Sequence, residues 1–526
     1  MNFNISQPFY EHALADPQRP ALFVEEKRYS YGELLRLVQP VAAWLQREGK
    51  SRLDRVGILA SRTLETYRGI LGAGWAGAAY VPLSTKLPED RLVQILERVD
   101  LDAVVIDANG LPLLTDRVLA ACPALLLAPG EAHSAERTDA SGRRLRIAGW
   151  DALPHFNGSD KTEIVAPESL AYIEFTSGTT GIPKGVMIST GALAHYVSVM
   201  RSSYGICKED STAASAEITF DISVSDMFLT WASGAELMVI PATQIMAPFA
   251  FLRKMRPTVW FSVPSSIGFM HRLKMLTPGS LDSIRVSFFS GETLPAASAQ
   301  IWQEAASKSI LDNLYGPTEA TVVCLGRRYA GPESLTPGRG VVSVGKPFEG
   351  MKAAILDSNL LEMPRGEHGE IALSGPQLSS GYFRDAEQTN LRYKMIRGER
   401  WYMTGDLGYQ DENGNFHHLG RLDNQIKIRG LRVELEEIDT HLREICSTDS
   451  VATIAWPMEN GVAKDIVAFV AGGRMRDESD VMAQLSKRLA PYMMPGEIHF
   501  LEALPLSPNG KVNRKDLSRL LAEQSK

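Results

Sequence analysis

The stretch that decides the fold is Thr176-Ser177-Gly178-Thr179-Thr180-Gly181-Ile182-Pro183-Lys184-Gly185. It follows a short apolar run, Ala171–Phe175, that predicts a buried strand, and a helical pattern begins near Thr190. A glycine- and hydroxyl-rich loop after a strand can turn its backbone N–H groups toward phosphate oxygens, with a lysine nearby to offset charge. The loop is not a Walker A motif, which ends in Gly-Lys-Ser/Thr, because Pro183 precedes Lys184. A plain surface loop has a similar composition, but these residues in this order favour phosphate binding.

Outward from this loop, apolar β-branched runs alternate with helical patterns through most of the first 420 residues. Such alternation predicts α/β architecture, with parallel sheets covered by helices. Near Gly369–Ser374 and Asn415–Leu419 the expected strands are shorter and turn-rich, which predicts a distorted small barrel that is partly antiparallel. The other expected elements are strands at Arg55–Ala60, Ala103–Asp107, Glu236–Ile240 and Thr258–Phe261 and a helix at Leu64–Trp75.

A domain boundary is expected near Gly420–Asn424, where glycine and charged residues separate two differently patterned regions. This divides the chain into an N-terminal domain, 1–420, and a C-terminal domain, 421–526. The second domain should be a compact α+β unit. Its expected elements are a strand at Gln425–Arg429, an acidic helix at Glu434–Glu444 and a last helix at Lys515–Gln524.

Composition limits the classes of function. The 526 residues are 44% hydrophobic and 22% charged, as in soluble globular proteins, and the net charge of −7 argues against nucleic-acid binding through a basic face. The N-terminus does not have the pattern of a signal peptide, and no apolar run is long enough to span a bilayer. Four widely spaced cysteines without a CxxC pair favour a reducing cytoplasm over a disulfide framework or a zinc site; they are Cys122, Cys207, Cys324 and Cys446.

Seven further motifs follow the phosphate loop in a fixed order. Together they resemble the acyl-adenylating superfamily, which includes acyl-CoA synthetases, luciferases and the adenylation domains of nonribosomal peptide synthetases. The likeness extends from Tyr29-Ser30-Tyr31-Gly32-Glu33-Leu34 nearly to the end of the chain. The seven motifs are Phe220-Asp221-Ile222-Ser223-Val224, Ser290-Gly291-Glu292, Asn313-Leu314-Tyr315-Gly316-Pro317-Thr318-Glu319, Gly369-Glu370-Ile371, Tyr402-Met403-Thr404-Gly405-Asp406, Gly420-Arg421-Leu422-Asp423 and Pro505-Leu506-Ser507-Pro508-Asn509-Gly510-Lys511.

Within that superfamily the chain is most similar to stand-alone amino-acid-activating enzymes of nonribosomal peptide synthesis. Phe220-Asp221 matches the segment that sets an aspartate against a substrate ammonium, and no carrier-protein motif follows Lys511. The resemblance implies an AMP-forming acid–thiol ligase that uses ATP and Mg²⁺ and loads the phosphopantetheine thiol of a separate carrier protein. It also implies a mobile C-terminal lid that turns about a hinge at Asp423, after which Lys427 and Gly430 would face the site.

The resemblance assigns roles residue by residue. Lys511 would bridge the substrate carboxylate and phosphate oxygens, and Lys184 would contact the β- and γ-phosphates. Glu319 would bind Mg²⁺, and all three residues would be catalytic. Without the family pattern, the interpretation would be that Glu319 starts a helix, Tyr315 belongs to the core and Asp406 is part of a turn. The residues expected to contact the nucleotide are Thr176, Ser177, Gly178, Thr179, Thr180, Gly181, Asn313, Tyr315, Gly316, Thr318, Asp406 and Arg421.

The acid substrate is expected to be a small or medium neutral amino acid, with proline, alanine and serine as first candidates. Asp221 would pair with its ammonium, because a buried carboxylate needs a partner; a turn-forming aspartate is the structural alternative. The expected substrate-binding residues, which add no second charge, are Phe220, Asp221, Ile222, Ser225, Phe261, Phe288, Ser290, Leu314, Val322 and Val323. Acyl- or aryl-CoA synthetases, d-alanine–carrier protein ligases and a catalytically dead binding module are the alternatives.

Overall fold

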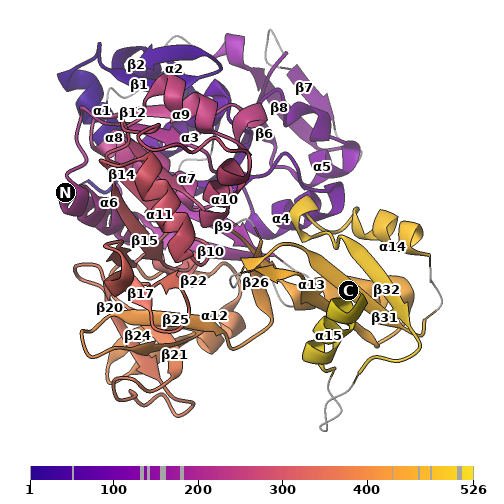
Figure 1. The fold of residues 1–526 in the computed structure, drawn as a ribbon. Helices are drawn as coiled ribbons and strands as arrows, with labels where there is room; N and C mark the ends of the chain where they lie inside the picture. The colour runs from indigo at the N-terminus through magenta and orange to yellow at the C-terminus, as the bar shows by residue number, and fades with distance from the viewer. Residues whose placement is uncertain are drawn as a thin grey trace.

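Two nine-stranded sheets and the helices on their faces form the larger part of the protein (Figure 1). The computed structural model describes residues 2–49, 53–130, 135–138, 142–153, 161–177, 183–428, 430–459, 462–473, 477–505 and 512–524. One apolar core joins both sheets with helices α2 (Tyr31–Glu48), α3 (Leu64–Trp75) and α6 (Thr190–Tyr204). This packing confirms the α/β class that the alternating pattern predicts.

The first large sheet carries the phosphate loop. Its central strands are parallel and almost wholly buried, which explains their continuous apolar runs. Strands β9 and β10 pair antiparallel, so the loop between them lies at a hairpin end. In spatial order the strands are β22 (Gly381–Tyr382), β10 (Lys184–Ser189), β9 (Leu170–Thr176), β4 (Ala79–Leu83), β3 (Arg55–Leu59), β5 (Ala103–Ile106), β6 (Leu125–Ala128), β8 (Arg144–Gly149) and β7 (Ala135–Thr138).

The second large sheet is also parallel at its centre and antiparallel at its edges. Its order is β19 (Lys346–Pro347), β16 (Leu325–Arg328), β15 (Ile310–Tyr315), β14 (Val286–Phe289), β13 (Val259–Ser262), β11 (Ser211–Ala214), β12 (Glu236–Val239), β1 (Pro20–Val24) and β2 (Lys27–Ser30). The carboxyl ends of β14 and β15 lie at one edge, where ligands bind in open α/β sheets.

Helices cover both sheets. Helix α2 begins with a capping box, in which the Glu33 backbone N–H donates to Ser30 and the Ser30 backbone N–H donates to the Glu33 carboxylate. Between α7 and α8 the backbone is wound as a π-helix over Ser225–Leu229. No helix in the described ranges is long and apolar enough to cross a bilayer. The remaining helices of this part are α1 (Gln7–Ala15), α4 (Glu89–Val99), α5 (Asp116–Ala121), α7 (Ile222–Val224), α8 (Thr230–Ala232), α9 (Phe249–Met255), α10 (Pro264–Arg272), α11 (Ala296–Ala305) and α12 (Ala386–Arg392).

A five-stranded antiparallel sheet follows and corresponds to the distorted small barrel expected from the turn-rich segment. Register shifts in β24, its longest strand, bend the sheet, and β25 pairs with that strand's second half. The strands are β20 (Lys352–Leu356), β21 (Gly369–Ser374), β23 (Tyr393–Ile396), β24 (Glu399–Gln410) and β25 (Phe416–Arg421).

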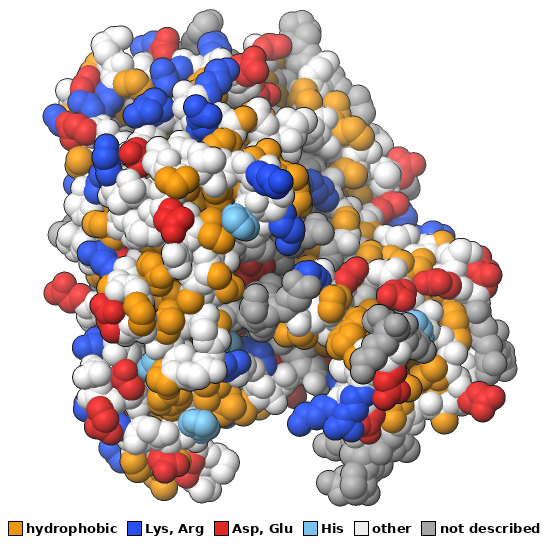
Figure 2. All heavy atoms as spheres, in the orientation of Figure 1, with side chains coloured by type: hydrophobic (Ala, Val, Ile, Leu, Met, Phe, Trp, Pro, Cys, Tyr) orange, Lys and Arg blue, Asp and Glu red, His pale blue; other side chains and the backbone are white. Residues whose placement is uncertain are grey.

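The C-terminal elements pack around a core of their own and lie at the right in Figure 1. The space-filling view shows a hollow between them and the five-stranded sheet at lower left (Figure 2). The elements are the hairpin β26 (Gln425–Ile428) and β27 (Leu431–Glu434), helices α13 (Leu435–Cys446), α14 (Glu478–Leu485) and α15 (Arg514–Gln524), and strands β28 (Val451–Ala455), β31 (Ile466–Ala471) and β32 (Glu497–Leu501). This confirms the α+β character expected for the end of the chain.

Candidate active site

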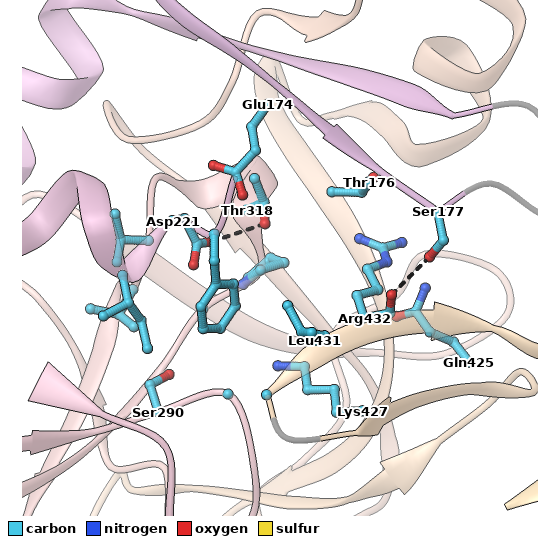
Figure 3. Close-up of a pocket in the computed structure, with 18 of the residues that line it drawn as sticks. Glu174, Thr176, Ser177, Asp221, Ser290, Thr318, Gln425, Lys427, Leu431 and Arg432 are labelled. Carbon is cyan, nitrogen blue, oxygen red and sulfur yellow. Dashed lines mark hydrogen bonds between the residues drawn. The ribbon is translucent and has the colours of Figure 1, made fainter. Parts of the chain in front are cut away.

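Two adjoining cavities lie where the hairpin β26–β27 meets the ends of β9, β14 and β15. They share Ser290, Tyr315, Asp406 and Arg421 in their walls. Figure 3 shows side chains from three separate parts of the chain converging on the first cavity. We refer to it as the acid cavity, because Asp221 lines it, and to the second as the nucleoside cavity, because Asn313 and Tyr315 line it.

The described ends of the phosphate loop lie at the acid cavity. Thr176 and Ser177 line it, and the Ser177 hydroxyl donates to the Arg432 carbonyl oxygen at 3.0 Å (Figure 3). Lys184 begins β10, and its ammonium donates to Gln388 Oε1 at 3.2 Å. Burial lowers the pKa of Lys184. Four loop residues and the late lysine fall outside the described residues; they are Gly178, Thr179, Thr180, Gly181 and Lys511.

Glu319 is fully buried and is held by two neighbours. Its carboxylate accepts hydrogen bonds from Arg432 at 3.0 and 3.2 Å and from the Tyr382 hydroxyl at 2.6 Å. Burial opposes its charge, but the Arg432 guanidinium lowers the pKa of Glu319 to about 2. Glu319 is therefore ionised, and its partner in this structure is the Arg432 guanidinium.

The described side chains alone supply too few ligands for Mg²⁺, so a bound substrate would have to supply the others. Within the described ranges no three His, Cys, Asp or Glu side chains gather as a metal site. Magnesium is commonly held by one or two carboxylates together with substrate phosphates, and a buried, ionised Glu319 meets that need. When bound there, Mg²⁺ would neutralise phosphate charge. Arg432 now bonds both oxygens of this carboxylate, so it would have to release Glu319 for the ion to be held there.

An ionised aspartate, Asp406, lines the nucleoside cavity. Asp406 accepts hydrogen bonds from the Tyr315 hydroxyl and from Arg421 Nη1 at 2.9 Å, and His418 Nε2 lies 3.3 Å from it. Burial opposes the charge of Asp406, but hydrogen bonding from His418 and the charge of Arg421 hold its pKa well below its usual range. Asn313, also in this wall, donates to two backbone carbonyl oxygens.

The expected hinge is tied to the same group of charges. Arg421 binds Asp423 with two hydrogen bonds, of 2.8 and 2.6 Å, and Arg392 Nη2 lies 3.4 Å from the same carboxylate. Burial opposes the charge of Asp423, but the hydrogen bonds from Arg421 lower its pKa. Because β25 ends at Arg421 and β26 begins at Gln425, Asp423 lies in the short link between two sheets.

Asp221 lines the acid cavity and lies just before α7. It is buried and accepts a hydrogen bond from the Thr318 hydroxyl at 2.9 Å (Figure 3). Burial is the main reason that its pKa is raised, to about 6. The expected substrate-binding residues that line this cavity are Phe220, Asp221, Ile222, Ser290, Val322 and Val323.

Four other expected substrate residues do not line the acid cavity. Leu314 lines the nucleoside cavity. The Ser225 hydroxyl lies 2.7 Å from the Tyr196 hydroxyl. Phe261 and Phe288 pack edge to face, 5.6 Å between ring centroids, in the core. Of the expected nucleotide residues, the two cavities bring together Thr176, Ser177, Asn313, Tyr315, Gly316, Thr318, Asp406 and Arg421.

The hairpin β26–β27 inserts its turn into the acid cavity. Gly430 and Lys427 line the cavity, and the Gly430 backbone N–H donates to Glu292 Oε1 at 2.8 Å. Gly430 has φ +78°, and a Cβ atom there would lie 2.4 Å from Val263 Cγ1. Only glycine therefore fits this position without moving its neighbours. Both residues line the cavity as members of a strand and its turn, and a role for them in a second position of the lid stays a prediction.

Sequence reasoning missed three site residues. Glu174 lines the acid cavity, Arg432 binds Glu319, and His418 approaches Asp406. The sequence contains a signal for Glu174, because it is the one acidic residue in the otherwise apolar run of β9. Arg432 and His418 are charged or polar residues on short strands and carried no comparable signal.

Comparisons with known proteins agree with this geometry. A family model described as AMP-binding enzyme matches residues 9–383. Tyrocidine synthase 2 of Brevibacillus parabrevis is 31% identical over 526 residues, which cover 98% of this chain and 14% of that protein. Enterobactin synthase component F of Escherichia coli (strain K12) is also 31% identical, over 96% of this chain and 38% of that protein. The chain thus spans well under half the length of either relative.

A solved structure matches over the whole chain. The crystal structure of the Vibrio cholerae adenylation domain AlmE in complex with glycyl-adenosine-5'-phosphate has a TM-score of 0.88 and 30% sequence identity, and the match covers 99% of this chain and 98% of that one. The family model covers well over half of the chain, and the likeness to AlmE includes both the larger part and the C-terminal elements. This chain therefore belongs to the AMP-binding enzyme family of adenylating enzymes.

Proposed function

We propose that the chain activates a small amino acid with ATP as an aminoacyl-adenylate and passes the aminoacyl group to the phosphopantetheine thiol of a separate carrier protein. The observation that carries this proposal is Asp221, a buried carboxylate in the wall of a cavity that Tyr315 and Asp406 also line. A carboxylate in that position suits an ammonium group, which fatty and aryl acids do not have.

The first half-reaction joins two anions. The substrate carboxylate attacks the α-phosphate, a new O–P bond forms, and pyrophosphate leaves. Catalysis must therefore align the groups and screen their charge. We assign Lys184 and Lys511 to phosphate charge, and Thr176 and Ser177 to hydrogen bonding with phosphate oxygens. Tyr315 would contact adenine, and Asp406 would accept hydrogen bonds from the ribose hydroxyls.

The second half-reaction needs a different arrangement. The thiol attacks the acyl carbon and AMP leaves, so Lys511 must withdraw before the carrier's arm can enter. We assign residues 1–420 to a core domain and 421–526 to a lid that turns about Asp423. The inserted hairpin, with Gly430 against Glu292, supports a thioester-forming position of the lid.

Small neutral amino acids are the first substrates to test, beginning with proline, alanine and serine, because Ile222, Val322 and Val323 give part of the cavity wall an apolar surface. The AlmE complex holds glycyl-adenosine-5'-phosphate, which is a small aminoacyl-adenylate. That likeness supports a short substrate here.

Amino-acid-dependent pyrophosphate exchange tests the proposal. Purified full-length protein is given ATP, Mg²⁺ and a panel of amino, fatty and aryl acids, with Lys511→Ala as control. We expect exchange with at least one small amino acid, loss of exchange on chelation of Mg²⁺, and at least about a hundredfold loss in the control. Exchange with fatty or aryl acids alone would indicate a CoA synthetase instead. Exchange with no acid would leave only a binding role.

A further inference from the structure

The face of β9 that looks toward the acid cavity carries polar groups without partners. Side chains two residues apart share a strand face, which places Tyr172, Glu174 and Thr176 together. Each of the three has a buried oxygen that accepts or donates no hydrogen bond among the described residues: Tyr172 Oη, Glu174 Oε2 and Thr176 Oγ1. Buried polar atoms are rarely left unpaired, so this row indicates a missing partner.

Of the three side chains, Glu174 costs the most free energy to bury without a partner, because it can carry a charge. Its side chain is 3% exposed, lines the acid cavity and points toward Asp221 and Thr318 in Figure 3. Asp221 lines the same cavity, and its charge and its backbone N–H both act on the Glu174 carboxylate. The neighbouring charges that act on Glu174 in the described part of the chain come from Asp221 and Glu319, and both are acidic.

Among the described residues the cations around the cavity act on other groups than Glu174. Lys427 lines the cavity, and its charge acts on Asp221. Arg432 binds Glu319, and Lys184 donates to Gln388. Two adjoining buried carboxylates repel each other unless a cation or a shared proton compensates them. A ligand with a single ammonium group can compensate one of them. A ligand with two can compensate both.

We propose that Glu174 and Asp221 together form a double anionic site, and that the preferred substrate is a short amino acid with a second ammonium group. This inference rests on the proposed amino-acid activation and replaces the neutral side chain expected there with a short, positively charged one. The apolar wall of Ile222, Val322 and Val323 favours a short side chain, so 2,3-diaminopropionate and 2,4-diaminobutyrate are the candidates. Glu174 would be a specificity-determining residue that touches the side-chain ammonium.

The test compares two substrates of the same size. In 2-aminobutyrate a methyl group replaces the second ammonium of 2,3-diaminopropionate. We expect full-length protein to show a kcat/KM in pyrophosphate exchange that is at least about tenfold higher for the diamino acid, the ratio that one additional charge-assisted contact provides. Glu174→Gln should remove most of this preference, chiefly by losing exchange with the diamino acid.

Glu236→Gln is the matched control. It makes the same change at a buried glutamate of β12 that binds Arg28, away from both cavities, and should keep the preference. A wild-type protein that favours 2-aminobutyrate, or treats both acids equally, overturns the inference whatever the variants do. An equal loss of both substrates in Glu174→Gln also overturns it, because a residue that only positions Asp221 would have that effect. Absence of exchange with any acid would instead refute the proposed function.

Discussion

Asp221 is the residue on which substrate choice depends most directly. Its carboxylate is buried, and among the described residues the Thr318 hydroxyl is the side chain that donates a hydrogen bond to it. We expect Asp221→Asn to lower kcat/KM for the preferred amino acid by roughly 10- to 100-fold, because a charge-assisted hydrogen bond contributes about 1.5–3 kcal/mol. Pyrophosphate exchange measures the loss. The matching acid without its α-amino group should lose little, and an equal loss for both acids would refute the ammonium role.

The pH dependence of the same step follows from the raised pKa of Asp221. Burial favours the protonated form, so the carboxylate ionises at a higher pH than an ordinary aspartate. Below that pKa the neutral acid cannot pair with the ammonium. We therefore expect kcat/KM for the amino acid to rise as pH increases through about 6 and then to level off. Asp221→Asn should flatten this limb; an unchanged limb would assign it to another group.

At the scale of single elements, the hairpin β26–β27 controls what the acid cavity can accept. Gly430→Ala places a Cβ atom 2.4 Å from Val263 Cγ1 and strains a φ of +78°, so the turn cannot stay seated. We expect pyrophosphate exchange within about threefold of wild type and thioester formation at least about tenfold lower. Loading of a carrier protein with radiolabelled substrate measures the second quantity.

Gly398→Ala is the control for this variant. Gly398 also has a positive φ, +81°, but an added Cβ atom would have nothing within 4 Å. The two variants therefore share the backbone strain and differ in the clash. If thioester formation fell equally in both, strain rather than the seating of the hairpin would be responsible.

The same elements show what the sequence could and could not predict. Helix α3 and strand β21 begin and end where their patterns predict, because local periodicity and burial determine both. Strand β13 begins one residue later than expected, at Val259. The position of Glu174 beside Asp221 depends on how β9 packs against α7, which no local pattern encodes. The Arg432–Glu319 pair joins residues 113 apart and depends on where the C-terminal elements dock.

At the scale of the whole molecule, buried ion pairs hold the C-terminal elements against the larger part. Arg91 of α4 binds Glu437 of α13, and both side chains are almost fully buried. Arg432 of β27 binds Glu319 in the same way. Breaking a buried pair by losing one partner costs about 3–5 kcal/mol. A rotation of the proposed lid would separate both pairs, so substrate binding would have to offset their loss. Phosphate with Mg²⁺ at Glu319 would replace one of them.

We propose Asp423 as the point about which such a rotation would occur, and a proline substitution there tests this assignment. Proline fixes φ, so Asp423→Pro should hinder the conformational change between the two domain arrangements that the half-reactions require. We expect pyrophosphate exchange to stay within about threefold of wild type and thioester formation to fall at least about tenfold.

Proline also removes the carboxylate that binds Arg421, so Asp423→Ala is the control. The alanine variant loses the same two hydrogen bonds but leaves φ free. If the alanine variant lost as much thioester as the proline variant, the Arg421 contact would explain the effect. If exchange and thioester formation fell together in the proline variant, Asp423 would not be the hinge.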